Sequence, residues 1–487
     1  MTGVRLSDAT VSQLPADVSR PAYRRHSIRT GVVHLGLGAF HRAHQADYFE
    51  KALASGDDRW GIIGASLRSP GVRDAMAPQN GLYTLVVRDA AGEQVSVIGA
   101  VKHALVAPED PARLVEAMAA PDTRLVTLTV TEKGYKLDPV SGTLIEDDAD
   151  VAADLASLDA PRTAPGFVTA ALAVRQERGL SAFTALSCDN LPHNGTRLRN
   201  AVMAMARRHD PHLADWIAEQ GAFPETMVDR IVPATTEEDI AAIAARTGIE
   251  DRATVRTEPF TQWVIEDRFA GERPDFEAFG VQVARSVQPW EEAKLRMLNG
   301  AHSGIAYLGG LAGIDFVHQF VGRPEGKAFV EALWNEAAPT LTPPPGLDIP
   351  SYRTALMERF GNPALQHRTR QIAMDGSQKI PQRLLSPIAQ RLERGQPIDR
   401  MALAVAAWMR WQAGLDDAGN AFVVDDPLAA ETARRFSGRE SPAEQVAALL
   451  AMEAIFPPKL AANEEFRNIL CAHLRRLIER GALGALS

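Results

Sequence analysis

The chain has 487 residues, of which 46% are hydrophobic, and carries a formal net charge of −9. This length exceeds one ordinary domain and predicts two or three. The acidic balance argues against a nucleic-acid partner, although a local cluster of Lys and Arg could still bind a small anion. Two isolated cysteines, Cys188 and Cys471, exclude a disulfide framework and a cysteine-based zinc site.

No run of about 18 apolar residues, the length that a membrane span requires, occurs in the sequence. The first 30 residues carry several arginines but no apolar core of a signal sequence. We therefore expect a soluble cytoplasmic enzyme without a membrane partner.

The first informative stretch, 31–46, is typical of a short buried strand, a glycine turn and a helix that continues to about Ala54. Gly36 permits a tight turn, and Gly38 lets the backbone approach a pyrophosphate at the helix N-terminus. His41 replaces the third glycine of the dinucleotide fingerprint, so a plain strand-to-helix turn is the alternative. The cofactor-contacting residues expected here are Gly36, Gly38, Ala39 and Phe40.

A second apolar strand at 60–68 should end near the adenosine ribose of a bound dinucleotide. An NAD enzyme usually offers an Asp or Glu there, but this chain offers Arg68 and Ser69, followed by Arg73. Either arginine could receive a 2′-phosphate, so the choice between NAD and NADP stays open. Two solvated surface arginines are an equally good interpretation.

Two more strand ends carry polar residues, and ligands bind at the carboxyl ends of strands in open α/β sheets. The buried strand at 124–131 leads into Thr131, Glu132 and Lys133. The strand at 182–187 leads to Asn190, which could instead cap a helix that begins near Thr196. The strand at 227–233 contains Asp229 next to Arg230.

Residues 289–303 read as a helix with a start signal in Pro289. At about 100° per residue, Lys294, Asn299 and His302 share an arc of roughly 140° and could face one cavity. A solvated lysine beside a core histidine is the simpler alternative.

Beyond Gln288, periodic helical segments dominate. We therefore predict an α/β, doubly wound Rossmann-type domain at 1–287, with an extra β portion, and a mostly α-helical domain at 288–487. A basic loop at 367–379 lies within the second domain.

Seven stretches together resemble the mannitol dehydrogenase family, the polyol-specific long-chain dehydrogenases. They follow one another in the family's order over nearly the whole chain: HLGLGAFHRAHQA (34–46), TVTEKGY (129–135), SCDNLPHNG (187–195), TMVDRIVP (226–233), EPFTQWVIED (258–267), KLRMLNGAHS (294–303) and IAMDGSQKIPQRLL (372–385).

The resemblance implies NAD-dependent, metal-independent oxidation of a secondary alcohol. Lys294 matches the general base, Asn190 and Asn299 match the amides that hold the alkoxide, and His302 matches the residue that orients the reacting oxygen. The expected substrate contacts are Lys133, Asp229, Arg370, Gln371 and Lys379.

This chemistry is also sound on physical grounds. A lysine removes a hydroxyl proton well only if burial and positive neighbours lower its pKa from about 10.4 toward neutrality. Two amide donors aimed at the oxyanion, each worth about 3 kcal/mol, lower the barrier without a metal. Nicotinamide carries the hydride.

The resemblance leaves the substrate between a polyol, an aldonate and a uronate. Lys133 and the loop at 367–385 are more similar to fructuronate reductases, whereas the segment at 65–69 and the Leu-Pro of 187–195 are more similar to mannitol dehydrogenases. A uronate carboxylate needs an extra cation, for which Lys133, Arg368 and Arg370 are candidates. We therefore favour D-mannonate/D-fructuronate over D-mannitol/D-fructose or an arabinitol-type polyol.

Two other classes are weighed against this expectation. A non-catalytic dinucleotide-binding protein would not need Lys294 or the amides, and all are present. A metal-dependent alcohol dehydrogenase would need a ligand cluster that the two isolated cysteines do not supply.

Overall fold

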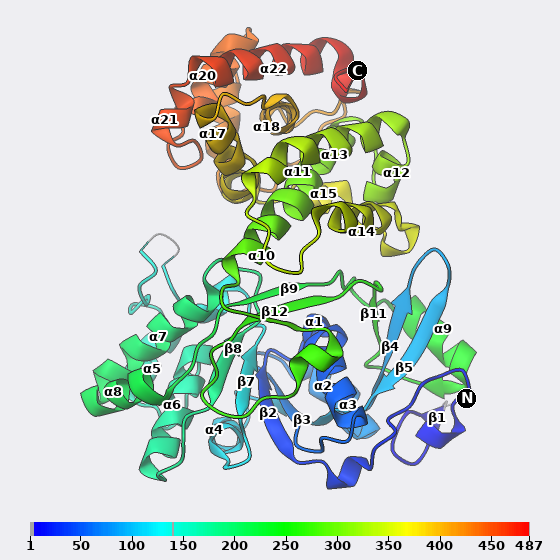
Figure 1. Ribbon diagram of the computed structural model, residues 1–487, viewed down its shortest axis with the longest axis vertical. Helices are drawn as coiled ribbons and strands as arrows, with labels where there is room; N and C mark the ends of the chain where they lie inside the picture. The colour runs from blue at the N-terminus through cyan, green and yellow to red at the C-terminus, as the bar shows by residue number, and fades with distance from the viewer. Residues whose placement is uncertain (1–3, 139–140, 487) are drawn as a thin grey trace. The chain divides into compact units, whose positions relative to one another are not determined.

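The computed structural model describes residues 4–138 and 141–486. The chain divides into two compact units, Met1–Val287 and Gln288–Ser487. The first unit is α/β and the second is mostly helical, which confirms the predicted fold class (Figure 1).

Five parallel strands form the central sheet of the first unit, in the order β6-β3-β2-β7-β8. They are β2 (Thr30–Leu35), β3 (Gly61–Ser66), β6 (Val101–Val106), β7 (Leu125–Leu128) and β8 (Thr184–Ser187). In β2, Val33 pairs with Ile63 of β3 and with Val126 of β7. The strand order thus reverses at β2, and ligands bind at the carboxyl ends of strands beside such a switch point.

Both faces of this sheet are buried, as the doubly wound prediction requires. Val32 packs in one core with α2 (Gln45–Ala54), whereas the neighbouring Val33 packs in a second core on the other face. The helices of that second face are α4 (Pro111–Ala119), α6 (Ala164–Glu177), α7 (Asn194–His209) and α8 (Pro211–Gln220). Successive strand residues point to opposite faces, so apolar runs such as Val32-Val33 fit a strand that is covered on both sides.

Three small sheets make up the extra β portion. Their strands are β4 (Tyr83–Arg88), β5 (Glu93–Ile98) and β11 (Val255–Thr257); β9 (Thr226–Asp229), β12 (Gln262–Glu266) and β13 (Gln282–Ala284); and β1 (Val4–Arg5) with β10 (Ile249–Glu250). Strand β6 was not expected from the sequence. It is an edge strand that carries Lys102 and His103, so it lacks the apolar pattern of a central strand.

The predicted helix at 39–54 is wrong in one respect, because it is two helices. They are α1 (Ala39–Ala43) and α2, and His44 between them has φ −125° and ψ −84°. The Nε2 atom of His44 lies 2.8 Å from the carbonyl oxygen of Gln262. A contact 218 residues away along the chain therefore holds the break.

The second unit is built around α11 (Gly300–Leu311), all of whose residues are buried. Gly304 lies against Phe329 of α13 (Pro324–Ala337), and Gly310 lies against Trp411 of α18 (Asp399–Trp411). A Cβ at either glycine would come within 3.0 Å of these rings, so small residues allow the helices to pack closely. The other helices of eight or more residues are α14 (Ile349–Gly361), α17 (Ser386–Glu393), α19 (Ala429–Phe436), α20 (Pro442–Leu450) and α22 (Glu464–Gly484).

Candidate active site

The glycine turn after β2 uses its two glycines for different reasons. Gly36 has φ +95°, and a Cβ there would lie 2.1 Å from the carbonyl oxygen of Thr129. Gly38 has φ −90°, is exposed, and a Cβ there would meet only the carbonyl oxygen of Gly36, at 3.7 Å. The fold itself therefore requires glycine at 36 but not at 38. Gly38 leaves open the space that a dinucleotide pyrophosphate would approach, so this turn fits such a cofactor.

Two stacked imidazole rings, those of His34 and His41, lie beside the glycine turn. The rings of His34 and His41 are 3.4 Å apart and nearly parallel. Burial lowers the pKa of His34 to about 3 and that of His41 well below its usual value, so both rings are neutral at pH 7. His34 Nε2 lies 3.1 Å from the carbonyl oxygen of Gly36 and donates to it. Ala39 and Phe40, both half-buried, are the first two residues of α1.

The two candidate arginines after β3 differ in their ion pairing. Arg68 and Ser69 are exposed. Arg73 is committed to two carboxylates, at 2.6 Å from Asp74 and 2.5 Å from Glu109. Of the two arginines, only Arg68 therefore keeps its guanidinium outside an ion pair among the described residues.

The ends of β7 and β8 are joined by a residue to which the sequence assigned no role. The Asp189 carboxylate accepts the backbone N–H groups of Val130, at 3.0 Å, and Thr131, at 2.8 Å, and the hydroxyl of Tyr135, at 2.5 Å. Burial raises the pKa of Asp189. Thr131 has φ +67°, which is strained for a β-branched residue. Asp189 thus fixes the backbone that presents the exposed residues Glu132 and Lys133. The available sequence signal was an acid directly after a strand.

Asn190 does not cap the following helix. Helix α7 begins at Asn194, and its N-cap is His193, which forms no side-chain cap hydrogen bond. Asn190 is exposed directly past the end of β8. Asp229 is the last residue of β9 and is 6% exposed.

The three candidates of the second unit lie where the helix changes its winding. Helix α10 (Gln288–Ala293) passes into a π-helical segment, η6 (Lys294–Asn299), and then into α11. The predicted uniform α-helix is therefore wrong for this segment. A π-helix bonds residue i to i+5, so Lys294 and Asn299 lie one above the other, and His302 follows Asn299 by three residues on the same face of α11. The three side chains therefore share a narrower arc of the helix surface than the 140° expected from a uniform α-helix.

Side chains distant in sequence bind backbone carbonyl oxygens of this π-helical segment. The Trp334 indole donates to the carbonyl oxygen of Met297 at 2.8 Å. Arg383 donates to the carbonyl oxygen of Asn299 at 3.5 Å and to the Ser303 hydroxyl at 3.2 Å. Buried backbone carbonyls need such partners when the helical ladder is interrupted.

Arg296 anchors the same segment from its other side. It donates to the carbonyl oxygen of Thr340 at 2.5 Å, pairs with Glu292 at 3.2 Å, and is 6% exposed.

An amide and an imidazole on this face have unused hydrogen-bonding capacity. Lys294, Asn299 and His302 are 7%, 9% and 6% exposed. Asn299 Nδ2 and His302 Nε2 are buried and have no hydrogen-bond partner within residues 4–138 and 141–486. Buried polar atoms are rarely left unsatisfied, and exceptions mark catalytic or ligand-binding groups. These two atoms could both bind the oxygen of a ligand.

The environment of His302 keeps its ring neutral. Burial is the largest influence and lowers the pKa of His302 well below its usual value, with further lowering by His367, Arg359 and Arg383. The ring centroid lies 4.7 Å from that of Phe360 and 5.0 Å from that of His367. Arg383 and His367 were present in the loop noted from the sequence, but nothing local assigned them to this cluster.

The candidate substrate residues of the 367–379 loop separate into two groups. Lys379 donates to the carbonyl oxygen of Met374 at 2.5 Å, and its pKa is lowered by burial and then by Arg383. Arg370 is exposed and lies over the Phe422 ring, 5.3 Å from its centroid. Gln371 is exposed. The charge of Arg383 therefore acts on Lys379, whereas Arg370 lies over the ring of Phe422.

Residues 4–138 and 141–486 contain no group of three or more His, Cys, Asp or Glu side chains that could hold a metal ion. Within the same residues, no helix combines the length and apolarity needed to cross a membrane.

Comparison with known proteins identifies the family. Residues 30–278 match the mannitol dehydrogenase Rossmann domain, and residues 286–478 match the mannitol dehydrogenase C-terminal domain. The chain is 44% identical to the D-mannonate oxidoreductase of Escherichia coli (strain K12), over 97% of each chain. It is 41% identical to a mannitol 2-dehydrogenase of Pyrenophora tritici-repentis, over 99% of this chain and 86% of the relative.

A solved structure agrees with these relatives. The Pseudomonas fluorescens mannitol 2-dehydrogenase ternary complex with NAD and D-mannitol superposes with a TM-score of 0.86, at 37% identity over 99% of both chains. Two family domains together cover most of the chain, and the two relatives are matched over 97% and 86% of their length, so the protein belongs to the mannitol dehydrogenase family of oxidoreductases.

Proposed function

We propose that the protein is an NAD-dependent dehydrogenase that interconverts D-mannonate and D-fructuronate by hydride transfer at a secondary alcohol. The observation that carries the dehydrogenase assignment is the unsatisfied pair Asn299 Nδ2 and His302 Nε2, on the helix face that Lys294 shares. This pair suits an oxygen that changes between hydroxyl and carbonyl. The NAD assignment is supported by the open position at Gly38 and by the NAD in the Pseudomonas fluorescens complex.

In the direction of oxidation, the neutral amine of Lys294 accepts the hydroxyl proton of the substrate. Asn299 Nδ2 then donates to the negative charge that develops on the oxygen, and Asn190 is proposed as a second amide donor. The neutral His302 ring orients that oxygen through Nε2. Lys294 becomes positively charged when it accepts the proton, and a protonated His302 ring would add a second positive charge. The low pKa of His302 keeps the ring neutral and therefore suits this role.

A nicotinamide ring supplies the hydride chemistry when the cofactor is bound. The chain's part is to hold it. Gly36 and Gly38 shape the turn, and Ala39, Phe40, Arg68, Ser69, Thr131 and Glu132 are the other residues proposed to contact the cofactor. Because Arg68 is exposed and outside any ion pair in the described chain, NADP is the alternative cofactor to NAD.

The aldonate is favoured over the polyol by one feature of the first unit. Lys133 is an exposed cation in the short helix η4 (Glu132–Tyr135), whose start Asp189 fixes. A cation that follows a fixed stretch of backbone suits a carboxylate, which D-mannonate has and D-mannitol lacks. The D-mannonate oxidoreductase relative supports this choice. Asp229, Gln371 and Lys379 are proposed for the hydroxyl groups, and Arg370 for the carboxylate.

D-mannitol/D-fructose is the second candidate, supported by the mannitol 2-dehydrogenase relative and by the complex with D-mannitol. The deciding experiment compares kcat/KM for D-fructuronate and D-fructose, each with NADH and with NADPH. We expect the highest value for D-fructuronate with NADH. A clear preference for D-fructose would replace the proposed substrate, and no reduction of either ketose would contradict the dehydrogenase proposal.

A further inference from the structure

A cavity of about 770 Å³ lies within the first unit, away from the proposed cofactor turn. Its walls are the outer edge of β6, the chain at 76–82 that follows α3 (Gly71–Met76), and the N-terminal segment at 8–26. Among the described residues, neither the glycine turn at 36–38 nor the loop at 67–70 contributes to its lining. The cavity is therefore a separate site of the same unit.

The charge of this lining is opposite to that of the whole chain. Four Lys and Arg side chains line it, and Asp8 is the single carboxylate among the described lining residues, although the chain carries a net charge of −9. The cations are Arg20, Arg25, Lys102 and Arg113. Such a local reversal of charge concentrates anions at the site.

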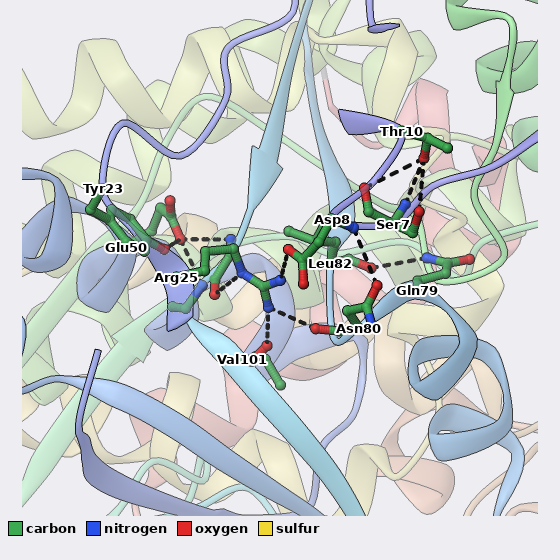
Figure 2. Close-up of polar contacts among 12 residues, drawn as sticks. Ser7, Asp8, Thr10, Tyr23, Arg25, Glu50, Gln79, Asn80, Leu82 and Val101 are labelled. Carbon is green, nitrogen blue, oxygen red and sulfur yellow. Dashed lines mark hydrogen bonds and ion pairs between the residues drawn. The ribbon is translucent and has the colours of Figure 1, made fainter. Parts of the chain in front are cut away.

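Part of this positive charge is fixed in place by the fold. Arg25 Nε donates to the carbonyl oxygen of Gly99 at 3.0 Å, and Nη2 donates to those of Asn80 at 2.7 Å and Val101 at 3.1 Å, as Figure 2 shows for the last two. Its side chain is 13% exposed, and it pairs with Asp8. Arg25 thus contributes a charge held in place, while its N–H donors bind backbone carbonyls and the Asp8 carboxylate.

Other groups keep donors for a ligand. Lys102 donates to the carbonyl oxygen of Ile28, and an ammonium group has two further N–H bonds. Arg113 is exposed, and no ion pair or side-chain hydrogen bond of its guanidinium is found in the described chain. Strand β6 ends the five-stranded sheet, and within residues 4–138 and 141–486 no strand pairs with its outer edge. Backbone N–H groups along that edge are therefore open to an acceptor.

The charges of these cations affect the pKa of His103, which also lines the cavity. Burial lowers the pKa of His103, and Lys102, Arg113 and Arg25 lower it further. These three charges therefore act on one small region, which disfavours another cation there and favours an anion. Beside them, Tyr23, Met76 and Leu105 provide apolar surface.

We propose that this cavity binds a phosphorylated small molecule, with the phosphoryl group at Lys102 and Arg113 and the organic part against the apolar wall. A phosphoryl group offers several acceptor oxygens, which suits an ammonium, a guanidinium and edge N–H groups together. The volume admits a ligand of the size that ordinary small-molecule sites hold. Nucleotides and sugar phosphates share this chemistry. The site goes beyond the proposed dehydrogenase function and does not depend on it.

The test is isothermal titration calorimetry on the full-length protein saturated with NAD, so that ADP cannot be counted at the cofactor turn. ADP, fructose 6-phosphate and inorganic phosphate are titrated separately, at low and at high salt. The variants are Arg113→Ala and Lys102→Gln. The matched control is Arg162→Ala, which removes another exposed arginine of the same unit that does not line the cavity.

We expect one equivalent of ADP or of fructose 6-phosphate to bind the NAD-saturated protein, and the tighter of the two identifies the source of the phosphoryl group. Arg113→Ala and Lys102→Gln should each weaken binding by about tenfold or more, and Arg162→Ala should leave it unchanged. Three results would overturn the proposal: no binding of either ligand, binding that NAD abolishes, or equal binding by the Arg113→Ala variant and the wild type. Ketose reduction should be unchanged in Arg113→Ala, so the outcome is independent of the proposed function.

Discussion

Arg383 donates a hydrogen bond to the hydroxyl of Ser303, 3.2 Å away, and thereby holds the residue that follows His302. The same guanidinium reaches the carbonyl oxygen of Asn299, at 3.5 Å. Burial lowers the pKa of Arg383 to about 10, so it remains charged at pH 7. One buried cation therefore stabilises the π-to-α junction and, after burial, His367 and Arg359, also contributes to the low pKa of His302.

Replacing Arg383 should change the pH dependence of catalysis. Arg383→Met removes one of the cations that lower the pKa of His302, so that pKa rises and the ring gains a proton at higher pH than in the wild type. We expect kcat to fall by about tenfold or more and its acidic limb to move to higher pH, with partial rescue in Arg383→Lys. Arg391→Met is the control, because Arg391 is also buried and bonded to backbone carbonyls, those of Pro397 and Glu336. If the acidic limb of the pH profile of kcat were unshifted in Arg383→Met, Arg383 would not influence the pKa of His302.

Asn299→Leu should separate catalysis from stability. Because Asn299 Nδ2 has no partner in the described chain, removing the amide should not lower the free energy of unfolding, whereas kcat should fall by about 10²–10³-fold. In Asn194→Leu, the control, a buried amide bonded to Asp189 and Thr226 is lost, and we expect destabilisation of about 2 kcal/mol or more. Urea denaturation and steady-state kinetics measure both. Equal destabilisation of the two variants would mean that Asn299 is a structural amide.

Lys294→Ala should reduce kcat by orders of magnitude and leave the dissociation constant of NADH nearly unchanged, since the proposed role is proton transfer. Lys327→Ala, which removes a lysine that is 56% exposed on α13, is the matched control and should be neutral. Near-normal turnover of Lys294→Ala at neutral pH would show that another group is the base.

The two glycines of the turn should respond differently to alanine. Gly36→Ala places a Cβ 2.1 Å from the Thr129 carbonyl oxygen at φ +95° and should destabilise the fold by about 2 kcal/mol or more. Gly38→Ala meets no such obstacle and should keep the wild-type melting temperature, while binding of NADH, followed by its fluorescence, weakens about tenfold or more. Unchanged NADH binding in Gly38→Ala would contradict the proposal that the cofactor pyrophosphate lies at this turn.

Glu50 should make stability depend on pH. Burial is the main influence and raises its pKa to about 7, although the Tyr23 hydroxyl and the Gly99 and Ala100 N–H groups donate to the carboxylate. Folding therefore favours the protonated acid, so the free energy of unfolding falls as pH rises from about 4.5 through 7, by roughly 3 kcal/mol at most.

Urea denaturation at pH 5, 6, 7 and 8 measures this fall. Glu50→Gln should flatten the profile, whereas Glu116→Gln, which removes a surface carboxylate paired with Arg178, should not. The same slope in Glu50→Gln and in the wild type would show that another group titrates.

The sequence was most informative where local pattern is sufficient. Mainly apolar runs predicted β2, β3, β7 and β8, because a strand covered on both faces is mostly apolar. Polar residues after those runs led us to predict a ligand site, because the carboxyl ends of parallel strands share one edge of the sheet; that site remains a prediction. Strand β6 escaped the same reasoning, since an edge strand tolerates Lys102 and His103.

The sequence by itself therefore determined the family, the order of α/β and helical parts, and the set of residues that could perform the chemistry. The tertiary structure alone decided how several of them are held. The π-turn at 294–299 is braced by Trp334 and Arg383, the break at His44 by Gln262, and Arg73 is occupied by Glu109. Each of these contacts joins positions tens to hundreds of residues apart, and no local pattern encodes which distant side chain will reach a given carbonyl or charge.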